Sequence, residues 1–201
     1  MINKIACPLC KTTNSSKFYK EKFREYLRCL SCDFVFVPKK HHLSDAEEKS
    51  RYDTHNNDPN DHRYRHFLSQ LLVPLLERIQ QQSNGLDFGS GPGPTLSLML
   101  EECGHSVDLY DKFYANDISV FEKKYDFITA TEVVEHLSEP MAEINRLIEM
   151  LNNQGYLAVM TQILTPQIDF SSWYYKNDPS HIGFFTKKSL SFLANYLNIE
   201  V

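Results

Sequence analysis

The sequence predicts an α/β fold with a largely parallel sheet, preceded by a small metal-binding module. Four of the five cysteines form two Cys-x-x-Cys pairs within the first 32 residues. From about residue 62, short apolar runs of strand length alternate with segments whose apolar residues recur at helical spacing. A glycine-rich segment joins the first of these strands to a helix, as in α/β proteins that bind a ligand at the carboxyl edge of the sheet.

Composition divides the chain into three parts. Residues 1–42 hold both cysteine pairs and close with the apolar run DFVFVPKK, which indicates a small ribbon-like module. Residues 43–61 are polar and rich in turn formers, so we expect a linker there. Residues 62–201 carry the alternating strand and helix pattern and form the main domain.

Charge is distributed unevenly along the chain. Residues 1–40 hold nine basic and three acidic residues, whereas the remainder holds 12 basic and 23 acidic residues. A basic module on an acidic body suits an anionic partner, although we favour the simpler view that lysines keep a very small domain in solution. The sequence has no apolar run of membrane-spanning length and no signal peptide at its start, so we expect a cytoplasmic protein.

The two cysteine pairs predict a structural zinc site. In a reducing compartment, such pairs bind metal instead of forming disulfides. Each pair forms a tight knuckle, and two knuckles complete a tetrahedral site of four thiolates with no open position. The module therefore depends on its metal for folding. The predicted ligands are Cys7, Cys10, Cys29 and Cys32, whereas Cys103 is expected to be a packed core thiol.

The main domain begins with a helix and a first strand. FLSQLLVPLLERIQQQ has apolar residues at helical spacing, and Pro74 kinks or breaks that helix. GLDFG follows as a strand. PTLSLMLEECG then reads as a helix with proline in its first turn and glycine at its end. SVDLYD is the second strand.

The remaining elements continue the alternation. YDFITATE is a third strand, EPMAEINRLIEMLNNQG a helix and YLAVMTQI a fourth strand. KKSLSFLANYLN is the last helix, and it runs into IEV at the end of the sequence. Strands joined through helices indicate parallel pairing in one sheet.

The glycine-rich segment LDFGSGPGP is the most informative part of the sequence. Gly89, Gly91 and Gly93 remove side chains, so a ligand can approach the backbone closely. A dinucleotide fingerprint requires a third glycine where Pro94 stands, which disfavours a pyrophosphate-containing cofactor. Asp111 lies at the tip of the second strand, where a carboxylate can accept hydrogen bonds from both hydroxyls of a ribose.

These residues carry a resemblance to a known family. LDFGSGPG resembles motif I of the class I S-adenosylmethionine-dependent methyltransferases, Asp111 matches their acidic residue, and ATEVVEHL resembles the segment after their fourth strand. The resemblance covers roughly residues 64–201. It implies a Rossmann-like sheet with helices on both faces, and S-adenosylmethionine as cofactor. The cofactor-binding residues that it implies are Asp87, Gly89, Gly91, Gly93, Asp111, Thr131 and Glu132.

The resemblance also suggests where the methyl group is transferred. Glu135 and His136 follow the third strand, and His136 is either a general base or a brace for the loop. WYYKNDPSHIGFF is similar to a segment of a bacterial methyltransferase family that often carries His-x-x-Phe-Phe. His181 within it is the best candidate for a polar residue facing the substrate.

The surroundings of the transfer site admit more than one interpretation. The aromatic segment, with Asp178, forms either a substrate lid or a cover over the sheet, and the cover suits Trp173 and Phe184 better. Tyr52 and His55 are weaker candidates for closing the site from the other side.

The acidic and histidine residues also allow a metal-dependent alternative. Glu132-x-x-Glu135-His136 with a later histidine resembles the metal-binding set of small-RNA 2′-O-methyltransferases, in which a divalent ion would polarise a hydroxyl. We favour the version without a metal, because Glu-Val-x-Glu-His is common in methyltransferases that lack one.

The end of the sequence departs from the family pattern. Class I methyltransferases usually close with two further antiparallel strands, and residues 198–201 stand where the first would begin. An incomplete C-terminal hairpin leaves an exposed sheet edge, so we expect a truncated chain, a homodimer through that edge, or lost activity.

The expected function is methyl transfer to a hydroxyl, amine or carbon nucleophile of a small molecule or carrier-bound metabolite. RNA methylation through the basic ribbon is an alternative, because some rRNA base methyltransferases carry an N-terminal zinc module beginning with a similar CPLC. Some sugar C-methyltransferases carry such a module as well, so the module alone does not identify the substrate. The negative charge of the body argues against RNA. A non-catalytic cofactor-binding or adaptor protein is the third possibility. No membrane partner is expected.

Overall fold

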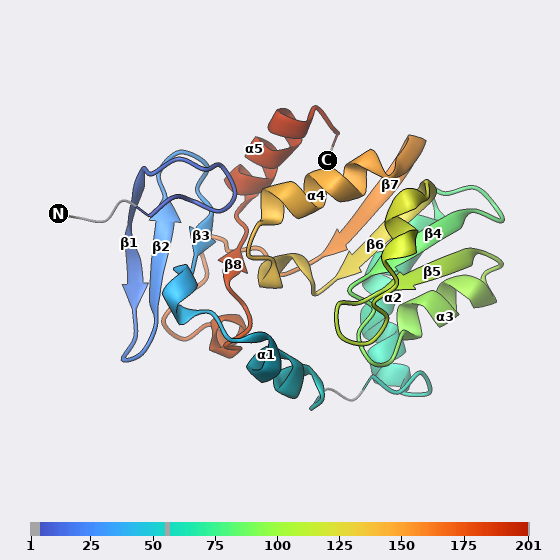
Figure 1. Cartoon of the computed structure of the whole chain (residues 1–201), viewed down its shortest axis with the longest axis horizontal. Helices are drawn as coiled ribbons and strands as arrows, with labels where there is room; N and C mark the ends of the chain where they lie inside the picture. The colour runs from blue at the N-terminus through green and yellow to red at the C-terminus, as the bar shows by residue number, and fades with distance from the viewer. Residues whose placement is uncertain (1–4, 55–56, 201) are drawn as a thin grey trace. The chain divides into compact units, whose positions relative to one another are not determined.

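The computed structural model describes residues 5–54 and 57–200 (Figure 1). The chain forms two compact units, each made of separate stretches of sequence. The ribbon unit comprises Met1–Asp45, Val134–Asn145 and Gln162–Val201. The sheet unit comprises Ala46–Val133 and Arg146–Thr161.

A parallel sheet forms the centre of the sheet unit. Its strands are β4 (Asn84–Phe88), β5 (Ser106–Tyr110), β6 (Tyr125–Thr131) and β7 (Leu151–Met160), in the spatial order β5-β4-β6-β7. All three pairings are parallel, which confirms the predicted α/β class. The carboxyl ends of the strands therefore meet at one edge of the sheet, where the predicted cofactor loop lies.

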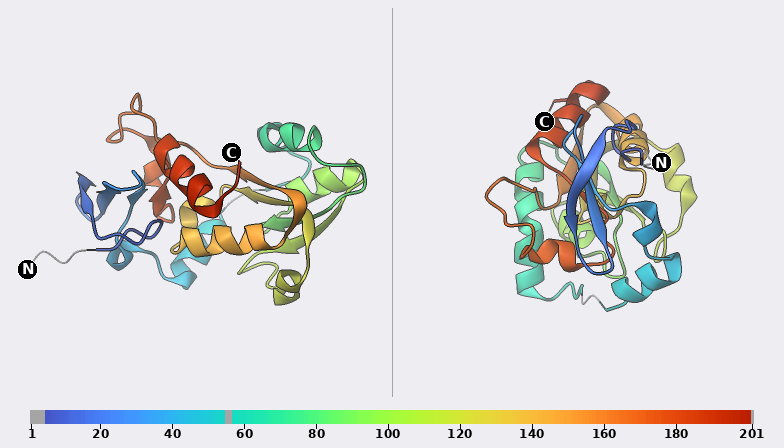
Figure 2. Two further views of the ribbon diagram at one scale, coloured as in Figure 1. Left: turned by 90° about the horizontal axis from the view of Figure 1, so that it is seen from above. Right: turned by 90° about the vertical axis from the view of Figure 1, so that its left-hand side faces the viewer.

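Helices α2 (His62–Leu76) and α3 (Thr95–Glu102) pack together against this sheet (Figure 2). Their leucines, spaced along one side of each helix, join β6 in a buried cluster that includes Leu68, Leu72, Leu100 and Phe127. The Asp61 side chain caps the first turn of α2 by accepting from the Arg63 amide at 2.8 Å. Pro74 lies inside α2, which ends two residues later.

Three differences from the expected elements concern the linker, the segment before β6 and the helix before β7. The expected linker contains a helix, α1 (Asp45–Tyr52), and a short 3₁₀ turn, η2 (Ile118–Glu122), precedes β6. Helix α4 (Pro140–Glu149) ends earlier than its apolar pattern suggests, because residues 151–155 belong to β7.

The ribbon unit contains a four-stranded antiparallel sheet. Its strands are β1 (Ser15–Lys20), β2 (Glu25–Cys29), β3 (Val35–Phe36) and β8 (Gly183–Phe184), in the order β1-β2-β3-β8. Val35 and Phe36 of β3 pair with Phe184 and Gly183 of β8. The ribbon sheet is therefore completed by a strand from the C-terminal part of the chain.

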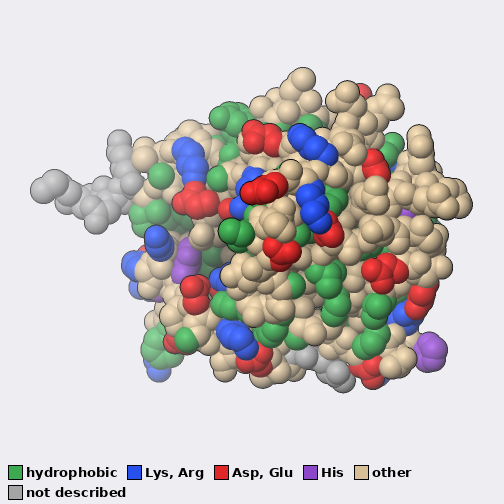
Figure 3. All heavy atoms as spheres, turned by 45° about the vertical axis from the view of Figure 1, so that its right-hand side comes forward, with side chains coloured by type: hydrophobic (Ala, Val, Ile, Leu, Met, Phe, Trp, Pro, Cys, Tyr) green, Lys and Arg blue, Asp and Glu red, His purple; other side chains and the backbone are tan. Residues whose placement is uncertain are grey.

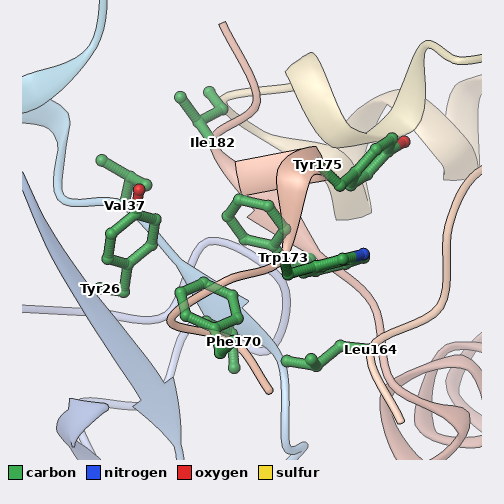
Figure 4. Close-up of a cluster of buried hydrophobic side chains, with 9 residues drawn as sticks. Tyr26, Val37, Leu164, Phe170, Trp173, Tyr175 and Ile182 are labelled. Carbon is green, nitrogen blue, oxygen red and sulfur yellow. The ribbon is translucent and has the colours of Figure 1, made fainter. Parts of the chain in front are cut away.

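Aromatic side chains fill the core of the ribbon unit (Figure 4). Tyr26 of β2 packs edge-to-face on Phe170 with ring centroids 5.0 Å apart, and Phe170 packs on Trp173 at 5.9 Å. The buried cluster also includes Val35, Val37, Leu164, Tyr175, Ile182 and Phe184. Residues from both ends of the sequence thus share one apolar core. The unit also holds the 3₁₀ turns η1 (Lys39–His41), η3 (Val134–His136) and η4 (Tyr174–Asn177), and helix α5 (Lys187–Leu197).

Cys103 does not lie in a core. It is exposed at the C-cap of α3, so the expectation of a packed thiol is wrong. The helix ends at Glu102 and the chain turns at Gly104, which has φ +90°. This turn leaves the Cys103 side chain on the surface.

The last described residues follow α5 without forming another strand. Within the described parts of the chain, the parallel sheet has β5 and β7 as its outer strands. No described helix is both long and apolar enough to cross a bilayer.

Candidate functional site

The glycine-rich loop joins the carboxyl end of β4 to α3 in the sheet unit. Gly89 and Gly91 have φ +77° and +65°, a backbone region that residues with a side chain rarely adopt. The Gly89 and Ser90 amides donate to the Tyr110 carbonyl at 2.7 and 3.2 Å. Glycine geometry and the end of β5 together fix the path of the loop.

The Asp111 carboxylate ties this loop to the turn after β5. One oxygen accepts from the Gly91 amide at 3.0 Å, and the other accepts from the Phe113 and Tyr114 amides at 2.8 and 3.1 Å. Asp111 is buried, with 8% of its surface exposed. Since an ionised carboxylate has about four acceptor positions, these contacts leave room for one further donor. Its predicted contact with a ribose stays a prediction.

Two of the three glycines are approached closely by the chain itself. A Cβ at Gly89 would lie 2.4 Å from Val133 Cγ2, and a Cβ at Gly93 would lie 2.5 Å from the Asn57 carbonyl oxygen. The Thr95 hydroxyl donates to the same carbonyl at 3.1 Å. The glycine spacing indicated a close approach, but no sequence signal identified Asn57, which lies in the expected linker.

Asp87, at the second-last position of β4, is a buried acid. It accepts from the Thr129 hydroxyl of β6 at 2.7 Å and is 4% exposed. Burial, reinforced by the nearby negative charge of Asp111, raises the pKa of Asp87 to about 6, although the Thr129 hydrogen bond opposes the shift. A cation beside Asp87 would lower this pKa again.

Tyr64 of α2 is a further member of the site. Its burial, together with the charges of Asp87 and Glu132, raises the pKa of the phenol to about 12. Glu132, directly after β6, has φ +53°, and its amide donates to the Met160 carbonyl at 2.8 Å. The sequence identified Glu132 through its motif, whereas Tyr64 is indistinguishable from other residues of an amphipathic helix.

Two buried hydroxyl groups indicate that the site suits a polar ligand. Ser90 lies in the glycine loop, and Thr131 ends the adjacent strand β6. Within residues 5–54 and 57–200, neither Ser90 Oγ nor Thr131 Oγ1 has a hydrogen-bond partner. Buried hydroxyls are normally satisfied. The hydroxyl, carboxylate and ammonium groups of S-adenosylmethionine would supply the missing partners, so the residues present fit this cofactor.

The ribbon unit brings three of the predicted transfer residues together. Ligand atoms of Glu135, His136 and His181 all lie within 4.8 Å of one another. His136 Nε2 is 4.0 Å from Glu135 Oε1, and the two imidazole rings have centroids 4.7 Å apart. The two histidines are 45 residues apart in the sequence. His136 lies at the end of η3 and His181 just before β8, and the fold brings these two segments together.

Both imidazoles are oriented by backbone carbonyls. His136 Nδ1 is 3.0 Å from the Ser180 carbonyl oxygen, and His181 Nδ1 is 2.7 Å from that of Tyr175. A carbonyl can only accept, so Nδ1 carries the proton in each ring and the neutral ring has its lone pair on Nε2. Each Nε2 is therefore the atom that can take up a proton or bind a metal.

The aromatic segment around His181 has a structural role in this unit. Trp173 and Phe184 are buried in the core, as expected for rings that cover a sheet, here the antiparallel one. The Asp178 carboxylate accepts from the Ser180 amide at 2.9 Å and shapes the turn before His181. The proposed role of this segment as a substrate lid stays a prediction.

The four predicted zinc ligands form one cluster. Cys7 and Cys32 have their sulfur atoms 3.7 Å apart, and Cys10 and Cys29 have theirs 3.4 Å apart. Tetrahedral coordination with Zn–S bonds of about 2.3 Å places sulfurs about 3.8 Å apart. The donor set and its spacing fit a structural zinc ion.

Tyr52 and His55 were candidates for closing the site. The Tyr52 hydroxyl donates to Glu48 at 2.7 Å, and its ring packs on Phe113 with centroids 6.0 Å apart. Phe113 follows Asp111 in the turn after β5, so Tyr52 covers that turn within the sheet unit. His55 lies outside the described residues.

Comparison with known proteins identifies the family. A family model described as a methyltransferase domain matches residues 60–201. The ubiquinone biosynthesis O-methyltransferase of Cereibacter sphaeroides is 27% identical over 97 residues, which cover 48% of this chain and 39% of that protein. The match thus spans about two fifths of the curated relative's length.

A solved structure supports the fold. The 1,6-didemethyltoxoflavin-N1-methyltransferase of Burkholderia thailandensis is similar, with a TM-score of 0.55 and 14% identity. The similarity covers 90% of this chain and 87% of that one. With the parallel sheet and the glycine-rich loop described above, these matches show that the chain belongs to the methyltransferase-domain family.

Proposed function

We propose that this chain transfers a methyl group from S-adenosylmethionine to a hydroxyl, amine or carbon nucleophile of a small molecule or carrier-bound metabolite. The observation that carries the proposal is the polar edge of the sheet unit. There, Asp87 and Asp111 lie beside a glycine loop whose neighbourhood holds two unsatisfied hydroxyls. The toxoflavin-pathway relative was solved with S-adenosylhomocysteine bound, which agrees with this cofactor class.

Each group at that edge has a role in the proposal. Asp111 accepts from a ribose hydroxyl at its remaining acceptor position. Asp87 draws the cofactor ammonium by charge, and Ser90 and Thr131 donate to or accept from the polar groups of the ligand. When bound, the cofactor supplies a methyl group on a positively charged sulfur.

A hydroxyl or amine acceptor loses a proton when it is methylated, so the proposed reaction needs a base. When bound, S-adenosylmethionine would supply the methyl group to the acceptor's electron pair, and the carbon–sulfur bonding pair would stay on its sulfur. His181 or His136 takes the proton of a hydroxyl or amine at Nε2, because Nδ1 of each ring already carries one. Glu135 stabilises the resulting imidazolium by its charge.

Calorimetry with S-adenosylmethionine tests the cofactor role directly. Asp111→Ala should weaken binding roughly 10- to 100-fold, because a charged hydrogen-bond acceptor is lost. Asp126→Ala is the matched control, since Asp126 accepts from the Asn84 amide at the amino end of the strands, away from the loop. Equal affinity of wild type and Asp111→Ala would refute the ribose role. A folded wild type that binds no cofactor would favour a non-catalytic protein.

The histidine geometry favours a metal-assisted variant of this function as a second candidate. Metal-binding histidines almost always donate their second ring N–H to a carbonyl or carboxylate, as both His136 and His181 do. With Glu135, they offer two nitrogens and one oxygen, a set that leaves coordination positions for a substrate hydroxyl.

Manganese binding separates the two candidates. Mn²⁺ favours nitrogen and oxygen ligands and leaves a zinc-filled thiolate site undisturbed. Electron paramagnetic resonance of the zinc-loaded protein should show bound Mn²⁺ that Glu135→Gln and His181→Ala abolish. His66→Ala, on the exposed side of α2, is the control. If the protein binds no Mn²⁺ at millimolar concentration, the metal-assisted candidate is refuted and the metal-free mechanism stands.

RNA binding and dimer formation are separate alternatives, and each is tested by a different measurement. On the face shown in Figure 3, acidic and basic side chains lie next to one another. Ion pairs of the sheet unit include Lys112–Glu48 and Lys123–Asp108. RNA methylation would require binding that falls steeply with salt concentration. A homodimer through β7 stays a prediction that light scattering would test.

A further inference from the structure

Side chains bind several backbone carbonyls of the segment that carries His181, residues 175–181. The His181 ring binds the Tyr175 carbonyl, and the His136 ring binds that of Ser180. The position of the segment therefore depends on the side chains that reach into it.

The Arg24 side chain contacts this segment at three points. Its guanidinium donates to the Lys176 carbonyl at 3.3 Å, to the Asp178 carbonyl at 3.0 Å and to the His181 carbonyl. One planar group thus fixes the backbone both before and at His181. The donors of an arginine fork have fixed relative positions, so this contact determines an orientation as well as a location.

Arg24 is itself held firmly within the ribbon unit. Its guanidinium lies over the Tyr26 ring, 5.3 Å from the centroid, and its carbonyl accepts from the Glu21 amide at 2.8 Å across the hairpin turn. Burial lowers the pKa of Arg24, whereas the charges of Tyr26, Glu21 and Asp178 oppose that shift. Glu21 also pairs with Lys176, a lysine that is only 4% exposed. The hairpin and the segment are thus joined at two adjacent points.

The hairpin connects this contact to the cysteine cluster. Arg24 directly precedes β2, and β2 ends at Cys29, one of the four clustered cysteines. The next strand, β3, pairs with β8 just after His181, and the Val37 amide donates to the Ile182 carbonyl at 2.9 Å. Residues of the N-terminal module therefore bind the chain up to His181 through Arg24, and directly after His181 through β3 and Val37.

We propose that Arg24 is a positioning residue for His181. In this proposal the cysteine module, residues 1–42, holds the segment of residues 175–181 in its position. This inference rests on the proposed function for its catalytic meaning, but its structural content is independent of the cofactor. Arg24 acts through the backbone: it fixes the carbonyls around His181, and the His181 ring then meets the Tyr175 carbonyl with Nδ1 protonated.

Nitrogen NMR of the histidine rings in the zinc-loaded full chain tests the proposal. The His181 signals are assigned by their absence in His181→Gln. In wild type, His181 should show a single tautomer protonated at Nδ1. Arg24→Ala and Arg24→Lys should both give mixed tautomers, with the Ile182 amide exchanging roughly tenfold faster, because lysine lacks the fork. The Ile182 amide is a suitable probe because it donates to the Glu135 backbone carbonyl at 2.9 Å.

Arg28→Ala is the matched control. Arg28 lies on β2, four residues after Arg24, and also contacts an aromatic ring, but its guanidinium pairs with Asp33 inside the ribbon. Millimolar guanidinium should restore the wild-type ring signals of Arg24→Ala, whereas ammonium should not. A variant that was only destabilised in general would not be restored by guanidinium alone.

The outcomes separate the two hypotheses. Unchanged His181 tautomer and exchange in Arg24→Ala would overturn the positioning role, as would equal effects in Arg28→Ala. Cofactor affinity, measured by calorimetry on the same samples, should stay within twofold of wild type in all Arg24 variants. If wild type itself binds no S-adenosylmethionine, the proposed function fails while the NMR result still decides the positioning role.

Discussion

Tyr175 donates its hydroxyl proton to Glu135 Oε1 at 2.5 Å, inside the aromatic core of the ribbon unit. Glu135 is 0% exposed, so its carboxylate depends on partners within the protein. The contact joins the two segments that hold His136 and His181, since Tyr175 also accepts from the His181 ring through its carbonyl. One tyrosine therefore organises both the acid and one histidine of the cluster.

Tyr175→Phe should destabilise the protein by about 1–3 kcal/mol, because a buried carboxylate loses a donor. Urea unfolding measures this loss. Tyr174→Phe is the control, since Tyr174 is 66% exposed and its change should cost less than about 0.5 kcal/mol. Equal losses in the two variants would show that the Tyr175 hydroxyl has no special role.

The stability of the sheet unit should depend on the ionisation of Asp87. Its pKa is raised from 3.8 to about 6 in the folded protein, so the folded state holds the proton more tightly than the unfolded state. The resulting stabilisation is complete below pH 4 and is lost as the pH rises through 6. The shift corresponds to about 3 kcal/mol.

Asp87→Asn removes this titration and keeps an oxygen that accepts from Thr129. The difference in unfolding free energy between Asp87→Asn and wild type should therefore grow in favour of the variant between pH 4 and pH 7. Comparing the two proteins at each pH cancels the titration of other groups. A difference that stays constant over this range would contradict the raised pKa.

Gly89→Ala should disrupt the cofactor loop. The added Cβ would lie 2.4 Å from Val133 Cγ2, in a backbone conformation with φ +77°. Gly104→Ala is the control: it has φ +90° but no atom within 4 Å of the added Cβ, so it should cost only the backbone strain of about 1–2 kcal/mol. Gly89→Ala should cost more in urea unfolding and weaken S-adenosylmethionine binding.

A second substitution tests whether the clash is the cause. Val133→Ala in the Gly89→Ala background removes the contacting methyl groups and should restore part of the lost stability. If it restores none, the strain of the backbone alone accounts for the effect.

Removal of metal from the cysteine cluster should loosen the C-terminal strand as well as the ribbon. β8 pairs with β3, so loss of the ribbon removes the partner of β8. Hydrogen exchange after chelation should therefore accelerate at β2, β3 and residues 182–184. The amides shared by β4 and β6 serve as the internal control, because they pair within the parallel sheet. Unchanged exchange at residues 182–184 would contradict the coupling.

The sequence alone determined the fold class, the family and two clusters of residues. Apolar runs bounded by turn-forming residues predicted β4, α3, β5 and β6 close to their observed bounds. The cysteine spacing predicted that the four cysteines cluster, and the glycine pattern placed the loop, because both depend on local geometry. The sequence pattern located element boundaries less accurately where two elements follow one another directly. The boundary between α4 and β7 is an example, because the apolar pattern of the helix continues into the strand.

Only the tertiary structure decided which distant segments meet. The ribbon sheet takes β8 from the C-terminal part of the chain, and Arg24 reaches the carbonyls around His181, more than 150 residues away. Asn57 and Tyr64 join the cofactor loop for the same reason. Such contacts involve ordinary side chains with no characteristic spacing. They arise from packing and from the need to satisfy buried carbonyls, which a linear pattern does not encode.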